Sequence, residues 1–169
     1  MDEIASLLEP QIPGLRRYAW ALLRDDEAAD DLVQDTLERA IRHWSRRRRD
    51  GDLKAWLFAI QRNLFLNDVR SRKVRGVQVG VEVLETSPAV ADPPDAHAGL
   101  RDILTGLDAL PEEQRSVLLL VGVEDLSYEQ VAQVLEIPMG TVMSRLSRAR
   151  GRLREFMENG RSAVLRRVK

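Results

Sequence analysis

The sequence predicts an all-α protein in which two small helical domains are joined by a flexible linker. Apolar residues recur at helical spacing before and after a central segment rich in glycine, proline and acidic residues. The chain has 169 residues, which suits two small domains, and 44% of them are hydrophobic, which is enough for packed cores. The expected division is 1–75 for the first domain, 76–97 for the linker, 98–159 for the second domain and 160–169 for a basic tail that frays.

Each helix expected in the first domain has its own apolar stripe. The first stripe is Leu15, Tyr18, Ala19, Leu22 and Leu23. Asp25 and Asp26 suit a cap that opens a second helix. Its buried stripe is expected to be Val33, Leu37, Ala40, Ile41 and Trp44. The polar run from Ser45 to Asp52 is interpreted as a loop, and a third helix follows. Its apolar side is expected to be Leu53, Trp56, Leu57, Ile60, Leu64 and Val69.

The linker has a composition of its own. Val77, Val79, Val81 and Val83 alternate as in a short strand, but glycines and prolines interrupt the segment, and it is acidic. A segment with little fixed structure is therefore expected.

The second domain carries the clearest local signals. Pro111 suits a helix start, with Glu112 and Glu113 at its positive end. Ser127 and Gln130 fit a capping box at the start of a later helix. The apolar face of that helix is expected to be Val131, Val134 and Leu135. A short turn over residues 136–139 then leads into another helix, opened by Gly140 and Thr141.

This last helix separates its chemistry by face. Val142, Leu146, Ala149 and Leu153 are expected to pack inward, whereas Thr141, Ser144, Arg145, Arg148 and Arg152 are expected to point outward. Two helices with a tight turn are the geometry that places the second helix in the DNA major groove, where arginine reads guanine. The alternative is a helical hairpin with a solvated arginine face. Because the cap, the turn and the separation of faces coincide, DNA binding is favoured.

Other classes of site find no support. The chain has no cysteine, which excludes disulfides and thiolate metal sites. His43 and His97 have no further ligand at metal spacing, and there is no phosphate loop or nucleophile elbow, so no enzyme, cofactor or metal is expected. The N-terminus is acidic and no apolar run approaches the ~20 residues of a membrane span, so a cytoplasmic protein without membrane insertion is expected.

Two blocks of motifs resemble a known family. The stretches Leu110–Arg115, Leu126–Ala132 and Gly140–Arg150 closely resemble region 4 of the extracytoplasmic-function sigma factors, a branch of the sigma-70 superfamily. Asp30–Leu37 looks like sigma region 2.2, and Ala55–Asn63 looks like regions 2.3 and 2.4. The resemblance implies a region 2 bundle in the first domain and a region 4 helix-turn-helix in the second. Such proteins bind core RNA polymerase and direct it to promoters, and an anti-sigma factor usually holds them inactive.

The resemblance also implies contacts with the polymerase. Region 2.2 docks on the clamp helices of the β′ subunit, and region 4 on the β flap. The matching outward residues are Asp31, Gln34, Asp35 and Glu38, whose spacing puts them on one helical face. A clustered acidic face fits a basic partner helix. Without the resemblance, the same stretch would be interpreted as a solvated acidic face. A magnesium site formed by these carboxylates is a further alternative, but an acidic docking face is the simpler interpretation.

For DNA, the resemblance implies capture of unpaired bases of the minus-ten element by the loop that precedes the third helix. The residues implied at this element are Arg46, Arg47, Arg48, Arg49, Trp56, Arg62, Asn63, Arg70, Arg72 and Lys73, with Arg75 as a further backbone contact. Trp56 is followed by Leu57, where primary sigma factors carry a second tryptophan. Trp56 is therefore either a wedge that opens the duplex or a core residue.

The outward residues of the last helix, from Thr141 to Arg152, then read the minus-thirty-five element. The linker is expected either to thread toward the active-site cleft of the polymerase or to be a passive tether.

Two alternative functions remain beside the sigma factor: a stand-alone helix-turn-helix regulator, and a decoy module that sequesters an anti-sigma factor. The motif block in the first domain argues against the regulator, and the arginines on both DNA-facing elements argue against the decoy.

Overall fold

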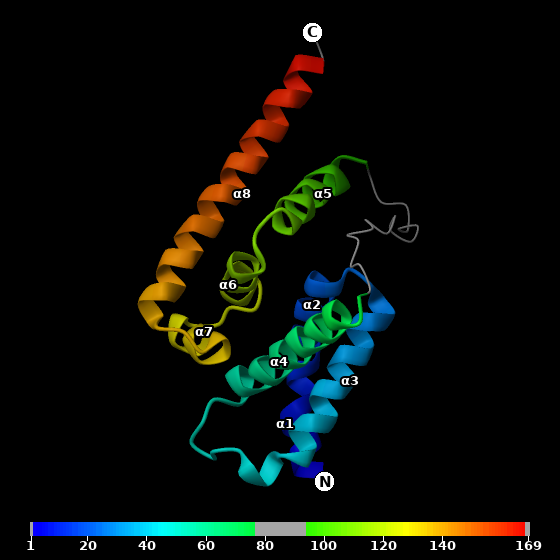
Figure 1. The fold of residues 1–169 in the computed structure, drawn as a ribbon, viewed down its shortest axis with the longest axis vertical. Helices are drawn as coiled ribbons and strands as arrows, with labels where there is room; N and C mark the ends of the chain where they lie inside the picture. Colours follow the sequence, from blue (N-terminus) through cyan, green and yellow to red (C-terminus); the bar gives the residue numbers. More distant parts are fainter. Residues whose placement is uncertain (1, 77–93, 168–169) are drawn as a thin grey trace. The chain divides into compact units, whose positions relative to one another are not determined.

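The computed structural model describes residues 2–76 and 94–167, which form helices and no strand (Figure 1). The predicted all-α class is confirmed. The elements are α1 (Asp2–Leu8), η1 (Glu9–Gln11), α2 (Ile12–Leu23), α3 (Asp26–Arg42), η2 (Trp44–Arg46), α4 (Leu53–Val74), α5 (Pro94–Asp108), α6 (Glu112–Gly122), α7 (Tyr128–Leu135) and α8 (Met139–Arg167). Most of the predicted linker, including its alternating valines, lies outside the described residues. Helix α8 continues through most of the expected basic tail, to Arg167, and the fraying of the last ten residues stays a prediction.

Contacts divide the chain into two units. The first unit comprises residues 1–79 and 119–139, and the second comprises residues 80–118 and 140–169. The domain boundaries expected from the sequence stay a prediction.

Aspartates begin two helices of the first unit. The Asp25 carboxylate accepts a hydrogen bond from the amide of Ala28 at 2.7 Å, so the cap expected at Asp25 and Asp26 is confirmed at the first of them. The Asp52 carboxylate accepts from the amide of Ala55 at 2.8 Å in the same way. The second cap fixes the point at which the arginine-rich loop becomes α4.

The core of the first unit lies between α2, α3 and α4. Tyr18 and Phe58 meet edge to face, with ring centroids 5.5 Å apart, and both are buried. The side chain of the buried Gln61 donates to the carbonyl of Leu15 at 2.9 Å, which ties α4 to α2 through a polar contact. Helix α7 also packs against α4 within this unit.

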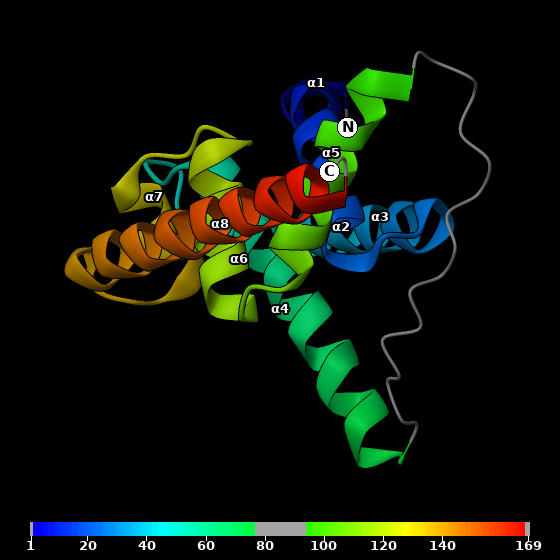
Figure 2. The ribbon, with the colours of Figure 1, turned by 90° about the horizontal axis from the view of Figure 1, so that it is seen from above.

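The ends of the long helices leave the core. Ile41 is 44% exposed, so the expectation that it is buried was wrong, and Val69, expected on the apolar side of α4, is 40% exposed. Helix α4 has 22 residues and α2 has 12, which correspond to lengths of about 33 and 18 Å. The second half of α4 therefore projects beyond its neighbours (Figure 2). Trp44, expected in the same buried stripe as Ile41, lies half-buried in η2.

In the second unit, α5 approaches α8 closely. A Cβ atom at Gly106 would lie 2.6 Å from Leu153 Cδ1 and 2.9 Å from Phe156 Cδ1, so a larger residue at this position would force these side chains to move. Leu107 and Val117 are buried, whereas Leu100 and Ile103 on α5 are exposed. Glu112 and Glu113 lie in the first turn of α6, as expected. Among the described helices, none is both long and apolar enough to cross a membrane.

Candidate nucleic-acid and polymerase interfaces

The acidic face of α3, defined as Asp31, Gln34, Asp35 and Glu38, is exposed along its whole length. Gln34 donates to the Glu38 carboxylate at 3.2 Å, so the two side chains lie along the same side of the helix. The opposite side of α3 buries Leu32, Val33 and Ala40. Thr36, also buried, bonds through its hydroxyl to the carbonyl of Leu32 at 2.7 Å. The core thus fixes the direction in which the acidic face points, and the binding of a basic polymerase helix by this face stays a prediction.

The loop before α4 is organised around two tryptophans. Trp44 and Trp56 meet edge to face with centroids 6.1 Å apart, and each is half-buried. The guanidinium of Arg47 lies 5.0 Å from the Trp44 ring centroid and donates to the carbonyls of Arg48 and Gly51, both at 3.2 Å. Of the four consecutive arginines, Arg47 therefore has a fixed structural position. Trp56 is neither fully buried nor fully exposed, and its role as wedge or core residue stays a prediction.

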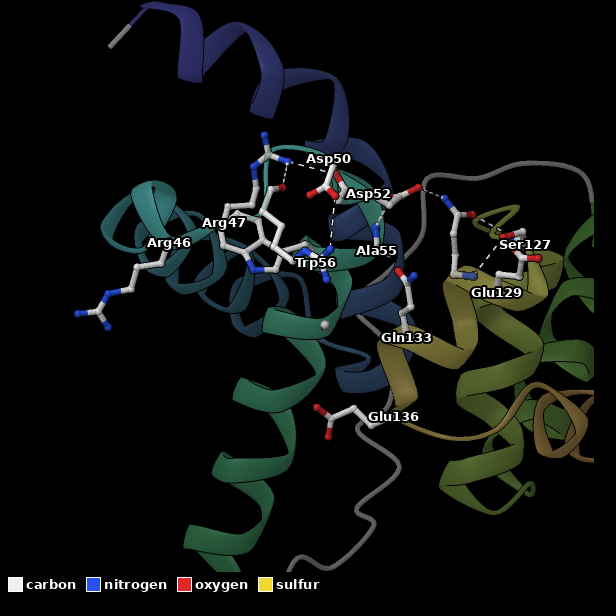
Figure 3. Close-up of a pocket in the computed structure, with 14 residues that line it drawn as sticks. Arg46, Arg47, Asp50, Asp52, Ala55, Trp56, Ser127, Glu129, Gln133 and Glu136 are labelled. Atoms are coloured by element: carbon white, nitrogen blue, oxygen red, sulfur yellow. Dashed lines mark hydrogen bonds and ion pairs between the residues drawn. The ribbon is translucent and has the colours of Figure 1, made fainter.

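A pocket of ≈ 1120 Å³ lies beside this loop, inside the first unit (Figure 3). The loop and the start of α4 supply Arg46, Arg47, Arg48, Asp50, Gly51, Asp52, Ala55, Trp56 and Ala59. The segment that contains α7 supplies Ser127, Glu129, Gln130, Gln133 and Glu136. Arginines and an aromatic ring suit a nucleotide. The four carboxylates make the pocket mixed in charge rather than purely cationic.

The α7 side of this pocket was missed in the sequence. Glu129, Gln133 and Glu136 recur at helical spacing and are exposed, so they form one polar face of α7 and its C-terminal end. That spacing is a visible signal. It does not say which other segment the face meets, because the partner loop lies about 80 residues earlier in the chain.

Further along α4, the predicted minus-ten residues differ in exposure. Asn63, Arg70, Arg72 and Lys73 are exposed, and Arg62 is half-buried. Arg72 pairs with Asp68 one turn earlier at 2.9 Å, a contact of exposed groups that contributes little to stability. Most of these cations lie on the projecting half of α4. Their side chains are therefore accessible, and their contact with the minus-ten element stays a prediction.

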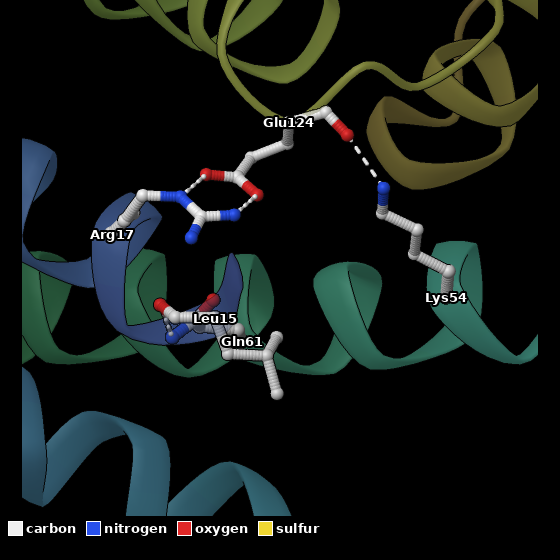
Figure 4. A network of polar contacts seen from close by, with 5 residues as sticks. All are labelled: Leu15, Arg17, Lys54, Gln61 and Glu124. Carbon is white, nitrogen blue, oxygen red and sulfur yellow. Dashed lines mark hydrogen bonds and ion pairs between the residues drawn. The ribbon is translucent and has the colours of Figure 1, made fainter. Parts of the chain in front are cut away.

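A buried carboxylate links the segment before α7 to α2 and α4 (Figure 4). Glu124 accepts two hydrogen bonds from the guanidinium of Arg17, at 3.0 and 3.1 Å. Its backbone carbonyl accepts from the ammonium of Lys54. A Cβ atom on Gly14 would lie 2.7 Å from Glu124 Oε2, so the carboxylate also approaches the backbone of α2 closely. Sequence reasoning missed this network, because nothing local distinguishes Glu124 from a surface acid.

The capping box predicted at the start of α7 is confirmed. Ser127 Oγ accepts from the amide of Gln130 at 3.1 Å, and the Gln130 side chain accepts from the amide of Ser127 at 2.7 Å. Gln130 also donates to Asp52 Oδ2 at 2.6 Å, and Asp52 is the cap of α4. One glutamine side chain therefore joins the N-terminal ends of two helices. The expected burial of Val131, Val134 and Leu135 is also confirmed.

The faces of α8 follow the prediction except at Thr141 and Arg145, which are both half-buried. Val142, Leu146 and Ala149 are buried, and Leu153 is half-buried. Ser144, Arg148 and Arg152 are exposed, and Thr141 is half-buried. The side chain of Arg145 is only 23% exposed and lies 3.7 Å from the carboxylate of Glu113 on α6. Arg145, which was expected to point outward, thus lies at the edge of the buried face. Its contact with DNA stays a prediction.

Two apolar residues on the exposed side of α8 were not anticipated. Met139 is 42% exposed and Met143 is 47% exposed, and they lie one turn apart at the start of the helix.

The described residues contain no cluster of three metal-ligating side chains.

Comparison with known proteins agrees with this arrangement. Residues 8–61 match the family model described as the Sigma2 domain of PhyR, and residues 100–153 match Sigma-70, region 4. EcfG, an ECF RNA polymerase sigma factor of Rhodopseudomonas palustris, is 38% identical over 156 residues, which cover 90% of this chain and 83% of that protein. SigM, an ECF RNA polymerase sigma factor of Bacillus subtilis, is 30% identical over 146 residues, which cover 85% and 88%.

A solved structure gives the same result for the fold. The sigma factor RpoE from Bartonella quintana, in complex with the anti-sigma factor NepR, is 35% identical with a TM-score of 0.78, and the match covers 94% of this chain and 98% of that one. A region 2 and a region 4 in one helical chain are typical of sigma factors. More particularly, this chain belongs to the ECF family of RNA polymerase sigma factors.

Proposed function

We propose that this chain binds core RNA polymerase and directs it to a specific set of promoters. The observation that carries the proposal is the 38% identity with an ECF sigma factor over 90% of the chain, which includes both a region 2 and a region 4. In this function the polymerase performs the chemistry and the chain supplies only binding energy and sequence preference. It acts without a cofactor, in the cytoplasm, where the polymerase and the chromosome are.

Each of three surfaces is assigned one binding partner. The acidic face of α3 binds a basic helix of the polymerase, which its continuous exposure and fixed orientation support. The pocket beside Arg46 and Trp56 receives an unpaired base of the minus-ten element, because stacking and cationic groups offset the cost of extracting a base. The exposed side of α8 enters the major groove at the minus-thirty-five element, which Ser144 and Arg148 support by their exposure.

We further propose that an anti-sigma factor controls this chain. The support is the likeness to RpoE, which was solved with NepR and is matched over 98% of its length. A protein that redirects the polymerase must be held inactive until it is needed, and one partner that covers polymerase-binding and DNA-binding surfaces achieves this.

Run-off transcription with purified core polymerase tests the proposal. A promoter library is transcribed with and without the chain, and with the double variant Asp31→Lys/Asp35→Lys. Transcripts that depend on the wild-type chain and share two spaced upstream elements are the expected result, and the double variant gives none. Absence of core binding by the wild-type chain would overturn the proposal, and tight promoter binding without polymerase would favour a stand-alone regulator.

One observation favours a second candidate. The model matched by residues 8–61 is described as the Sigma2 domain of PhyR, and the PhyR of Bartonella quintana was solved as an anti-anti-sigma factor in complex with the anti-sigma factor NepR. A decoy that binds an anti-sigma factor without binding the polymerase is therefore the alternative. The two candidates differ in one measurement. A sigma factor binds core polymerase directly, whereas a decoy restores transcription by another sigma factor only when the anti-sigma factor is present.

A further inference from the structure

The start of α8 exposes two methionines on the side of the helix that also carries polar and basic groups. Met143 is 47% exposed, and Met139, the first residue of the helix, is 42% exposed. Beside them Ser144, Ser147 and Arg148 are exposed, while the opposite side of the helix is buried. Single exposed apolar residues are common on protein surfaces. Two of them, one turn apart on a helix proposed to enter DNA, call for a chemical reason.

The helical positions show how this surface meets a groove. Gly140, Ser144, Ser147 and Gly151 recur at helical spacing and are all exposed, so small residues line the centre of the outward side. By the same 100° rotation per residue, Met143 lies on one flank of that line and Arg148 on the other. Small residues allow the helix axis to come close to the base edges. The longer Met143 and Arg148 then reach further on either side.

The two flanks suit different features of the major groove. Arg148 suits guanine acceptors or phosphates. The methyl group of thymine is the apolar feature in that groove, and apolar side chains discriminate thymine by contacting it. Methionine is unbranched and flexible, so its thioether end adapts to the position of such a methyl group. Residues at the start of a recognition helix are those that contact base edges, which is where Met143 lies.

We propose that Met143 contacts the 5-methyl group of a thymine in the minus-thirty-five element and so helps to set its sequence, with Met139 supporting this contact from the preceding turn. This inference rests on the proposed function, because it requires α8 to read that element. It adds a residue that selects sequence through apolar contact to a surface otherwise described by its arginines and serines.

Substitution of single thymines by deoxyuridine tests the contact, because it removes one methyl group and leaves the base pairing unchanged. Binding of the full chain with core polymerase is measured on promoter duplexes in which each thymine of the minus-thirty-five element, on either strand, is replaced in turn. We expect one position at which the wild-type complex loses about fourfold in affinity, as for one buried methyl group. The Met143→Ala complex is expected to bind both duplexes equally at that position.

Two variants serve as controls. Met143→Leu keeps an apolar side chain and is expected to retain the dependence on the methyl group. Arg148→Ala is expected to bind more weakly on every duplex and yet to retain the same ratio between thymine and deoxyuridine. Because Met143 is about half exposed, its replacement is expected to leave the melting temperature of the chain unchanged.

The failures are distinguishable. If wild-type binding depends on the minus-thirty-five sequence but no deoxyuridine substitution matters, the methyl contact is refuted and the proposed function stands. The same holds if the deoxyuridine penalty persists in Met143→Ala, because another group then contacts the methyl. If the wild-type complex shows no dependence on the element at all, the proposed function fails together with this inference.

Discussion

Arg17 and Glu124 lie 107 residues apart in the sequence and form a bidentate ion pair in which only the arginine is exposed. The Glu124 side chain is 1% exposed, whereas that of Arg17 is 56% exposed. The preceding residue offers a contrast. Arg16 pairs with Asp30 at 2.9 Å, and the side chains of that pair are 57% and 54% exposed. Two neighbouring arginines of α2 thus make ion pairs of similar length in different surroundings.

The two pairs are expected to differ in their contribution to stability. Arg17→Ala leaves a buried carboxylate without its cation, which is expected to lower the free energy of unfolding by about 1–3 kcal/mol. Arg16→Ala removes an exposed pair and is expected to cost about 0–1 kcal/mol. Urea denaturation of the two variants and the wild-type chain measures the difference.

A double variant shows whether the orphaned charge is the cause. Arg17→Ala/Glu124→Gln has no buried charge, so it is expected to be less destabilised than the sum of the two single variants. Equal and small losses for Arg16→Ala and Arg17→Ala would show that water reaches the Glu124 carboxylate and that the contact with α2 does not hold in solution.

The same network shows what the sequence was able to predict. The capping box of Ser127 and Gln130 was predictable because both partners lie within one helical turn. The second bond of Gln130, to Asp52, joins residues 78 positions apart, and no local pattern indicates it. Glu124 likewise reads as a surface acid until α2 and α4 supply its partners. Helix caps and buried stripes are local properties, whereas the pocket and the buried carboxylate depend on which segments meet.

Helical spacing in the sequence predicted most of the candidate DNA-binding face, and the exposure of the side chains in the structure corrected it. Helical spacing placed Ser144 and Arg148 correctly on the exposed side of α8. It placed Arg145 there too, although that side chain lies at the boundary and reaches Glu113. Met143 was overlooked because a methionine in an amphipathic helix is ordinarily assigned to the core. For a residue at the edge of an apolar stripe, the direction of the side chain depends on the helices packed beside it, and the sequence does not place those helices.

Two glycines of the second unit are expected to respond oppositely to the same substitution. Gly106 faces Leu153 and Phe156 at distances at which a methyl group would force both side chains to move, so Gly106→Ala is expected to destabilise the unit by about 1–3 kcal/mol. Gly151 lies within α8 with open space beside it. Gly151→Ala is therefore expected to stabilise by about 0.5–1 kcal/mol through helix propensity. Thermal unfolding compares the two, and a gain in stability for both would mean that α5 does not pack on α8 as described.

Charge reversal on α3 is expected to remove polymerase binding without affecting the fold. Asp31→Lys/Asp35→Lys replaces the centre of an exposed acidic face, so attraction to a basic partner helix becomes repulsion, whereas Asp31→Asn/Asp35→Asn is expected to weaken binding less. Titration of labelled chain with core polymerase measures both. The control variant Glu3→Lys/Glu9→Lys changes the net charge of the chain by the same amount, but on α1 and η1, and is expected to bind core polymerase normally. An equal loss of binding in this control would show that net charge, and not the acidic face of α3, causes the effect.

Loss of Arg148 is expected to change which promoters are selected as well as how tightly they are bound. Its side chain is exposed on α8, and a bidentate contact to a guanine contributes about 1–3 kcal/mol of discrimination, so Arg148→Ala is expected to reduce the preference for one base pair of the minus-thirty-five element by about tenfold or more. Arg101→Ala on α5 removes the same charge and is expected to keep the preference. Binding of each variant with core polymerase is measured on all single-base changes of the element. A uniform loss on every sequence for Arg148→Ala would assign this arginine to a phosphate, because a phosphate contact carries no sequence information.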